Sequence, residues 1–400
     1  MDCTVHGLEP LPYHRELRDY LKGHERELWE WFASARAKEN YTETLRLDLL
    51  KATYRLDAAG HPDLYRYAEE AKTALGLNVP VTLYQAQEST HLNAALYFMS
   101  GEGHVVFAGP VLSLLSGDEL KTVIGHELAH HLLWRRDDGD FLITDRLIDS
   151  AASDHRAQPA HFQSARCYRL YTEIFADRGS LRVCGDLNTV VGSLVKMQTG
   201  LSQVSGASYL KQADEIFQSS NPSTDGLTHP EAFIRARALA LWHKDGSACE
   251  ELISKMIERV ASLDELDLLG QMRLTELTRR VLEQLLRPKW FQTEAVVGHA
   301  KLFFENFQAA KTVDDLLPEE LAGCDPWLAD YLAYVLLDFV AADPELDEMP
   351  LAAALELSRR LHIDHSLEKA AVKELKTKVR QLKRLREEGA EMLAKAEAAA

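Results

Sequence analysis

Residues 126–130 of this 400-residue chain read His126-Glu127-Leu128-Ala129-His130. Because an α-helix has 3.6 residues per turn, positions four apart lie on one face, and both imidazoles can reach one cation. Glu127 then lies beside that cation. Bound zinc lowers the pKa of a water toward about 7, and a nearby glutamate can accept its proton as the water attacks a carbonyl. The pattern predicts a zinc hydrolase that cleaves amide bonds.

The sequence around this motif predicts a helix over residues 118–134. Ser116 and Glu119 fit a capping box at its start, and the run from Asp137 to Gly139 ends it. His131 faces away from the histidine pair, so we interpret it as structural. Apolar residues recur at helical spacing through the segment: Leu120, Val123, Ile124, Leu128 and Leu132.

A catalytic zinc needs a third protein ligand and an open fourth position. The His-x-x-Gly-x-x-His continuation is absent, because Leu133 and Arg136 stand where its Gly and third His would be. Glu173 is the best candidate, and Asp177 shares its helical face, where it would orient a ligand imidazole. The alternative is a solvated acidic pair. The apolar residues 174–176 favour the ligand interpretation, because an unpaired buried carboxylate is costly.

Three motifs together resemble the HtpX and CAAX prenyl protease type of zinc metallopeptidase, in the forty-eighth M family of peptidases. They are the His-Glu-x-x-His helix with its approach over residues 117–125, the segment Glu173–Asp177, and Thr228-His229-Pro230 followed by Arg235. The resemblance covers residues 76–242. It implies one zinc per chain, with Glu173 completing the site formed by His126 and His130.

The resemblance also implies roles for residues outside the zinc ligands. His229 would stabilise the oxyanion or occupy the open zinc position in a resting state, whereas without the family pattern it reads as a turn residue. Arg235 would pin the loop over residues 221–230 to a carboxylate, for which Asp177 is the candidate. Asn93 and Ala94 are similar to the family's substrate-facing edge strand.

The segments 81–84, 94–98 and 105–107 have the composition of strands and predict a small antiparallel sheet. An edge strand beside the metal can bind an extended peptide through main-chain hydrogen bonds. The alternative is that the strands only cover the metal helix. We therefore expect a mainly α (α+β) fold, with a zincin-type core flanked by helical N- and C-terminal regions.

Composition limits the remaining function classes. The chain is 46% hydrophobic and 27% charged, an ordinary globular balance, and its net charge of −17 argues against a nucleic-acid partner. No apolar run reaches the roughly 18 residues of a membrane span, and the start at Met1 lacks a signal region. We expect a cytoplasmic protein. The five cysteines are scattered, odd in number and without metal-ligand spacing, so reduced thiols are expected.

The predicted domains are an N-terminal helical region (1–75), a zinc metallopeptidase domain (76–245) and an α-helical C-terminal domain (246–400). Within the last, residues 327–365 resemble TerB-like domains, and the segment from Asp343 to Asp347 is either an acid-rich capped turn or a second metal site. Apolar residues from Leu367 to Leu382 predict a short coiled-coil helix, which offers contacts for a protein partner or for self-association.

Two functions from different classes fit this sequence. In the first, the chain is a zinc endopeptidase that acts on proteins or peptides, with Glu127 as the general base. In the second, it is a catalytically silent or autoinhibited adaptor that works through its helical C-terminal region. The intact Glu127 favours the first, because a purely structural zinc site does not need a base. No motif points to an exopeptidase.

Overall fold

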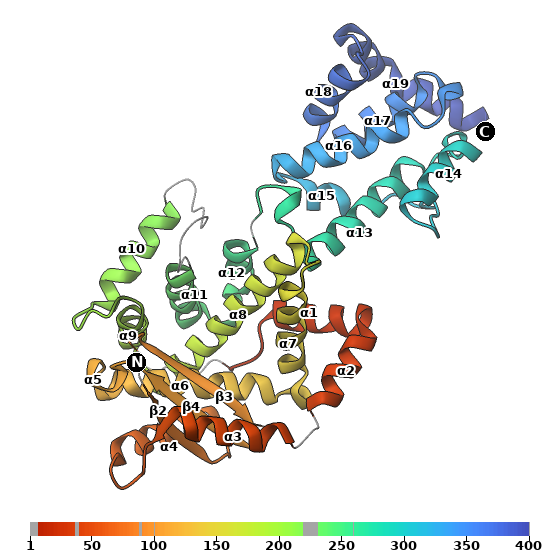
Figure 1. Cartoon of the computed structure of the whole chain (residues 1–400). Helices are drawn as coiled ribbons and strands as arrows, with labels where there is room; N and C mark the ends of the chain where they lie inside the picture. The colour runs from red at the N-terminus through yellow and green to blue at the C-terminus, as the bar shows by residue number, and fades with distance from the viewer. Residues whose placement is uncertain are drawn as a thin grey trace. The chain divides into compact units, whose positions relative to one another are not determined.

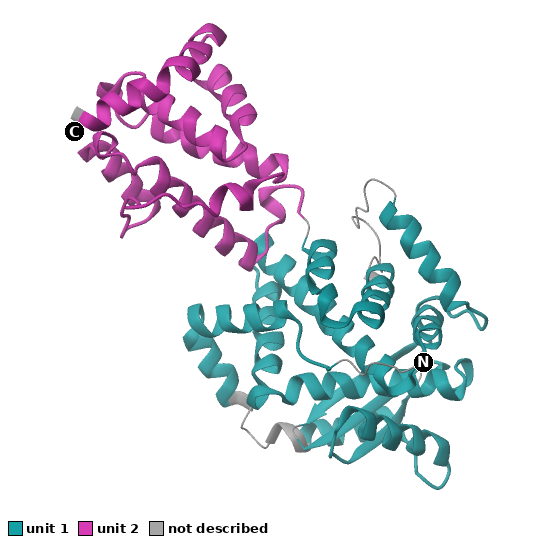
Figure 2. Cartoon of the chain, turned by 180° about the vertical axis from the view of Figure 1, so that it is seen from behind, with its two compact units in different colours: residues 1–259 teal, residues 260–400 magenta. Residues whose placement is uncertain are grey.

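The computed structural model describes residues 7–36, 40–87, 90–99, 101–218, 231–258 and 260–399. The chain divides into two compact units, residues 1–259 and 260–400 (Figure 2). Figure 1 shows that the chain is mainly helical, as predicted, with one small sheet in the first unit.

Unit 1 carries the predicted metal helix and the four strands found among the described residues. Its strands are β1 (Thr53–Arg55), β2 (Val81–Ala86), β3 (Asn93–Met99) and β4 (Glu102–Ala108). Its helices are α1 (Pro12–His24), α2 (Arg26–Arg36), α3 (Asn40–Ala52), α4 (Pro62–Leu75), α5 (Val111–Leu114), α6 (Gly117–Arg135), α7 (Asp140–Ser153), α8 (Pro159–Cys184), α9 (Leu187–Thr199), α10 (Gly206–Gln218), α11 (Glu231–Asp245) and α12 (Glu250–Ile257), with short 3₁₀ turns η1 (Asp137–Gly139) and η2 (Gly246–Cys249).

The sheet is mixed, which corrects the prediction of an antiparallel sheet. Its strand order is β1-β2-β4-β3, and β2 runs parallel to β4 while the other two pairs are antiparallel. β3 and β4 form a hairpin, and β4 inserts between β2 and β3, so it has the same direction as β2. β1 comes from the predicted N-terminal helical region. β3 is an edge strand among the described residues.

Helices cover both faces of the sheet. On one face Leu49 of α3 packs with Tyr84, Met99 and Val106 in a small apolar cluster. Because side chains alternate along a strand, neighbours such as Val105 point to the opposite face, where α6 lies. Val105 is completely buried there. The metal helix is therefore packed directly against the sheet, next to the edge strand β3.

The helices α6 and α8 cross at very small side chains. A Cβ atom added to Gly179 would lie 2.3 Å from the Cβ atom of Ala129. A Cβ atom on Gly125 would lie 3.1 Å from the side chain of Val183. This close approach brings the face of α6 that carries the histidines against the face of α8 that carries Glu173.

We expect Gly179→Ala to destabilise unit 1 by about 1–3 kcal/mol, because overpacking a tight contact forces the helices apart. The measurement is urea unfolding followed by circular dichroism. Gly192→Ala on α9 is the matched control, since its new Cβ atom meets nothing closer than 3.9 Å. That control should be neutral or up to about 1 kcal/mol more stable, because alanine favours helix. Equal stabilities of the two variants would contradict the crossing argument.

The N-terminal helices and the segment after residue 245 both belong to unit 1. The ring of Tyr13 in α1 stacks on Tyr171 of α8, with centroids 4.8 Å apart. The Tyr171 hydroxyl donates to Glu258 (2.6 Å), and Arg178 of α8 donates to Glu250 (2.8 Å). These contacts with α8 explain why the unit boundary follows residue 259, whereas we predicted a boundary after residue 245.

Unit 2 is entirely helical among its described residues. A single apolar cluster, drawn from residues 281–385, forms its core, including the fully buried Leu336 and Phe339. Its helices are α13 (Leu268–Leu285), α14 (Glu294–Phe303), α15 (Leu317–Leu321), α16 (Pro326–Val340), α17 (Met349–Arg360), α18 (Asp364–Glu374) and α19 (Val379–Ala399), with 3₁₀ turns η3 (Leu263–Glu265), η4 (Lys289–Phe291) and η5 (Pro344–Leu346).

The structure bears on two sequence predictions for unit 2. The pattern from Leu367 to Leu382 is divided between α18 and α19 instead of forming one coiled-coil helix, and Lys376 between them has a positive φ of 53°. Asp343 accepts hydrogen bonds from the Glu345 amide and the Thr293 hydroxyl, so it caps η5. This agrees with the capped-turn alternative. The TerB-like resemblance stays a prediction.

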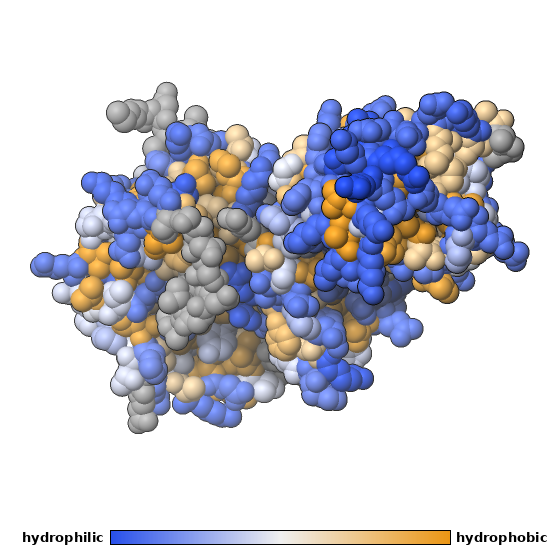
Figure 3. Space-filling model, turned by 90° about the horizontal axis from the view of Figure 1, so that it is seen from above, coloured by the Kyte–Doolittle hydropathy of each residue, from blue (hydrophilic) through white to orange (hydrophobic). Residues whose placement is uncertain are grey.

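The surface is mixed in character. Figure 3 shows one face, on which hydrophilic residues surround separate groups of hydrophobic ones. The most exposed apolar side chains of unit 2 are Leu302 (82%), Val379 (72%) and Leu316 (64%). Within the described ranges, no helix combines the length and the apolar character needed to span a membrane.

Candidate metal centre

The helix α6 presents the histidine pair from a rigid position. It begins at the predicted capping box, in which the Ser116 amide donates to the Glu119 carboxylate at 2.8 Å. It ends where Asp137 and Asp138 take positive φ angles, at the predicted break. Eleven of its nineteen residues are buried. The packing on both sides therefore fixes the positions from which the two imidazoles project.

The helix α8 supplies two carboxylates on one face, as the four-residue spacing predicts. Asp177 is buried, with a side chain only 4% exposed, and the side chain of Glu173 is 30% exposed. The interpretation as a solvated acidic pair is therefore wrong for Asp177. Ile174, Phe175 and Ala176 are fully buried, as their apolar character indicates.

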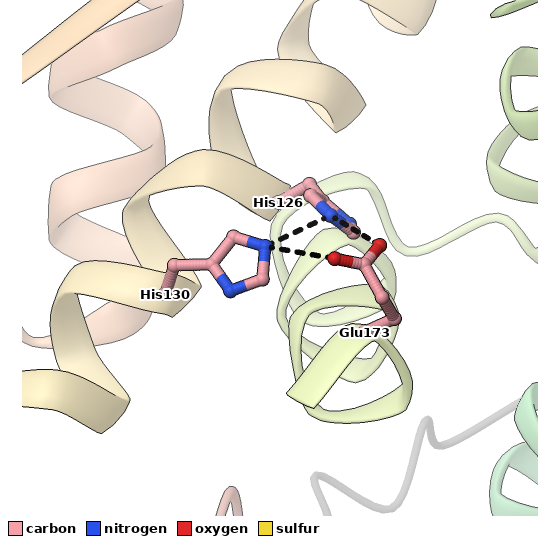
Figure 4. A group of neighbouring side chains, drawn as sticks. All are labelled: His126, His130 and Glu173. Carbon is pink, nitrogen blue, oxygen red and sulfur yellow. Dashed lines mark hydrogen bonds and ion pairs between the residues drawn. The ribbon is translucent and has the colours of Figure 1, made fainter. Parts of the chain in front are cut away.

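The side chains of His126, His130 and Glu173 converge on one point (Figure 4). The two Nε2 atoms lie 3.2 Å apart, and the Glu173 oxygens lie 3.3 Å from His126 Nε2 and 3.6 Å from His130 Nε2. Tetrahedral zinc with bonds of about 2.0–2.1 Å places neighbouring ligand atoms about 3.3 Å apart. Both the donor set and the spacing therefore fit zinc. Among the described residues this is the only such group.

The electrostatics of the centre favour a cation. Burial lowers the pKa of His126, but hydrogen bonds to Asp177 and Glu173 outweigh it and raise that pKa to about 10. Burial and the neighbouring His126 lower the pKa of His130 to about 4. The carboxylates of Glu173 and Asp177 thus both lie close to the His126 ring, where they would favour a positive ion.

Asp177 and Arg235 lie behind the converging side chains and contact them. Asp177 Oδ1 lies 3.1 Å from His126 Nδ1, which leaves the other ring nitrogen facing Glu173. Arg235 of α11 donates two hydrogen bonds of 2.7 Å to Asp177 and also lies 2.8 Å from Glu173. Burial raises the pKa of Glu173, but Arg235 and His126 outweigh it and hold that pKa well below its ordinary value.

Glu127 lies on the sheet side of the centre. It is 6% exposed, and burial raises its pKa to about 7, against the lowering effect of His126 and of a backbone hydrogen bond from Leu96. Leu96 is the middle residue of the edge strand β3. A carboxylate whose pKa lies near neutrality is suited to accept a proton and release it again.

The edge strand carries the predicted substrate residues. Asn93 is exposed and Ala94 is half-buried, and they pair with Ala108 and Phe107 of β4. The Leu96 amide donates its hydrogen bond to Glu127, so it does not donate to β4. Because alternate residues of an antiparallel strand direct their backbone groups to the same edge, Ala94 shares this open edge with Leu96. Asn93, one residue earlier, directs its backbone groups toward β4.

The predicted residue His229 lies outside the described residues, together with the Thr228 and Pro230 of its motif and the preceding loop from residue 221. Its role stays a proposal.

Sequence analysis missed Trp134. Its indole stacks on the imidazole of His130, with centroids 5.4 Å apart and an interplanar angle of 25°. The spacing could have revealed it, because Trp134 follows His130 by four residues on the same helix face. Its Nε1 and the Nδ1 of His130 are buried, and neither has a hydrogen-bond partner among the described residues.

Two histidines on a helix, a glutamate from a second helix and an adjacent small sheet with an edge strand define a zincin-like metallopeptidase class. The model for peptidase family M48 matches residues 59–138, so this segment of the chain is similar to that family. The match includes β2, β3, β4 and the histidine pair of α6, and it stops before α8. Searches of the curated proteins and of the solved structures found no match.

Proposed function

We propose that this chain is a zinc-dependent endopeptidase that hydrolyses peptide bonds of proteins. The observation that carries this proposal is the convergence of His126, His130 and Glu173 at tetrahedral spacing beside the buried Glu127. The M48 match supports the peptidase class, and the finer resemblance to HtpX and CAAX prenyl proteases is part of this proposal.

Each residue has a distinct role in this proposal. His126, His130 and Glu173 would hold one zinc, which would supply Lewis-acid chemistry and lower the pKa of a nearby water. Glu127 takes the proton of the attacking water and passes it to the leaving amine. Asp177 orients the His126 ring, and Arg235 holds Asp177 and Glu173 in place. His229 would stabilise the oxyanion, or it would occupy the open zinc position in a resting state.

The substrate is a protein or peptide in extended form. The open edge of β3 offers main-chain hydrogen-bonding groups at Ala94, two residues before Leu96, whose amide donates to Glu127. A peptide added there as a further strand would place a carbonyl beside the centre with little demand on its sequence. Asn93 lies at the start of this strand and would contact the same peptide through its exposed side chain. We propose a cytoplasmic site of action.

Metal removal tests this proposal. We expect protein dialysed against a chelator to stop cleaving casein, and one equivalent of zinc to restore cleavage, because the three ligand side chains hold a single ion. Peptides blocked at both ends should be cleaved as well as free-ended ones, since no described group marks a site for a chain terminus. Absence of cleavage with one zinc bound per chain would overturn the proposal.

The adaptor function remains the second candidate, and one observation favours it. Unit 2 exposes the apolar side chains of Leu302, Val379 and Leu316, which a protein partner would cover. A peptidase whose C-terminal helices recruit a protein partner would combine both functions.

A further inference from the structure

We propose that Trp134 and Phe98 form an apolar wall beside the metal centre, and that this wall selects a large apolar substrate side chain within two residues of the cleaved bond. The inference rests on the proposed peptidase function and adds the class of side chain that the enzyme accepts. We call Trp134 and Phe98 the aromatic wall.

The first half of the wall belongs to the metal helix. Trp134 lies one turn after the ligand His130, and the two rings stack with their centroids 5.4 Å apart. The indole is partly exposed. A substrate whose carbonyl lies at the metal therefore meets this indole on the side of the centre beyond His130.

The second half belongs to the edge strand. The ring of Phe98 in β3 contacts Trp134 edge to face, with centroids 6.0 Å apart, and it also lies 4.9 Å from the ring of His131. Phe98 is partly exposed too. One wall is thus built from two elements, and both of them also contact the catalytic centre.

His131 holds the two halves together. Its Nε2 lies 3.2 Å from the carbonyl oxygens of Met99 and Glu102, to which its N–H donates. These residues end β3 and begin β4, so the hydrogen bonds tie that end of the hairpin to α6. Met99 directly follows Phe98, and Trp134 follows His131 by three residues. The wall is therefore held at a fixed position along both elements.

The spacing along β3 places the wall close to the cleaved bond. Leu96 donates to the candidate base Glu127, and Phe98 lies two residues further on, about 6.6 Å along the strand. A peptide paired with β3 directs alternate side chains to the α6 face. The side chain that faces the wall is thus within two residues of the bond beside Glu127.

The chemistry of the wall favours apolar side chains over charged ones. Among the described residues, its two rings contact each other and the rings of His130 and His131. A carboxylate would lose hydration against these rings, and the buried Trp134 Nε1–H is the unpaired donor that they offer in exchange. A lysine or arginine is attracted to an indole face, but it too would lose hydration against these rings. Leucine, methionine and phenylalanine gain the contact without that cost.

The test is a library of end-blocked peptides in which the two positions on each side of the cleaved bond carry Ala, Leu, Phe, Lys or Glu. We expect the wild type to prefer Leu and Phe over Lys and Glu by about tenfold or more in kcat/KM at one of these positions. Trp134→Ala should abolish the preference at that position and leave the others unchanged, and Trp134→Phe should restore it. The matched control is Trp31→Ala, at an indole 61% exposed on α2.

A uniform loss over all peptides in Trp134→Ala, or an unchanged profile at equal zinc content, would overturn the proposal. Failure of the peptidase function is distinguishable from this result. If the wild type cleaves nothing, fluorescence anisotropy of labelled Leu- and Lys-containing peptides on zinc-loaded Glu127→Gln still measures selection by the wall. Tighter binding of the Leu peptide than of the Lys peptide supports the wall if adding Trp134→Ala removes that difference. Equal binding of the two peptides overturns the proposal.

Discussion

Glu127→Gln is expected to lower kcat for casein and peptide cleavage by about a hundredfold to ten-thousandfold. Glutamine keeps the shape of the side chain, but its amide cannot accept the proton of the attacking water. Glu127 is not one of the three converging ligand groups, so the variant should bind zinc as the wild type does. The measurement is steady-state kinetics on protein of equal zinc content, checked by metal analysis.

Asp118→Asn is the matched control for this change. It makes the same carboxylate-to-amide replacement on the same helix, at an exposed position two turns before His126. Its activity should equal that of the wild type. If Glu127→Gln retained activity within about threefold at equal zinc content, Glu127 would not be the general base.

Glu173→Ala is expected to weaken zinc binding by more than about a hundredfold. Loss of a residue that only orients a ligand already costs about 10–100-fold in affinity, and Glu173 is proposed to contact the metal itself. Without it, only the two imidazoles of α6 remain among the converging groups. The measurement is competition with a chelator of known affinity, with circular dichroism to confirm the fold.

The control for Glu173 is Asp149→Ala on α7. Asp149 also forms an ion pair with α8, through Arg169 at 3.0 Å, but its side chain is 59% exposed and lies outside the metal centre. Zinc affinity should not change in this variant. An unchanged affinity in Glu173→Ala would show that the third ligand is another residue, and residues 219–230, which the structure does not describe, would be examined first.

Local sequence patterns predicted the parts of the site that depend on one helix. The capping box at Ser116, the helix break at Asp137 and the shared face of His126 and His130 all follow from spacing along α6. The pairing of Asp177 with Arg235 was expected from the family resemblance, and the structure contains that contact. These features are predictable because neighbouring residues in the sequence determine them, or because a known motif brings them together.

Features that depend on contacts between distant segments were not predictable. The parallel pairing of β2 with β4 depends on how the hairpin inserts into the sheet, and β1 lies in a segment that reads as helical. The aromatic wall needs Phe98 and Trp134 to meet across two elements. The attachment of residues 246–258 to unit 1 depends on Arg178 and Tyr171, whose partners the sequence does not indicate.

The contacts of Arg235 with two carboxylates bear on how the candidate metal centre is held together. Two acidic groups placed side by side would repel each other in an empty centre, but here the guanidinium contacts both Glu173 and Asp177. One guanidinium therefore offsets part of the repulsion between the two carboxylates and holds both of them in position. If Glu173 binds a metal ion as proposed, that ion would meet a carboxylate which the protein itself already holds in place.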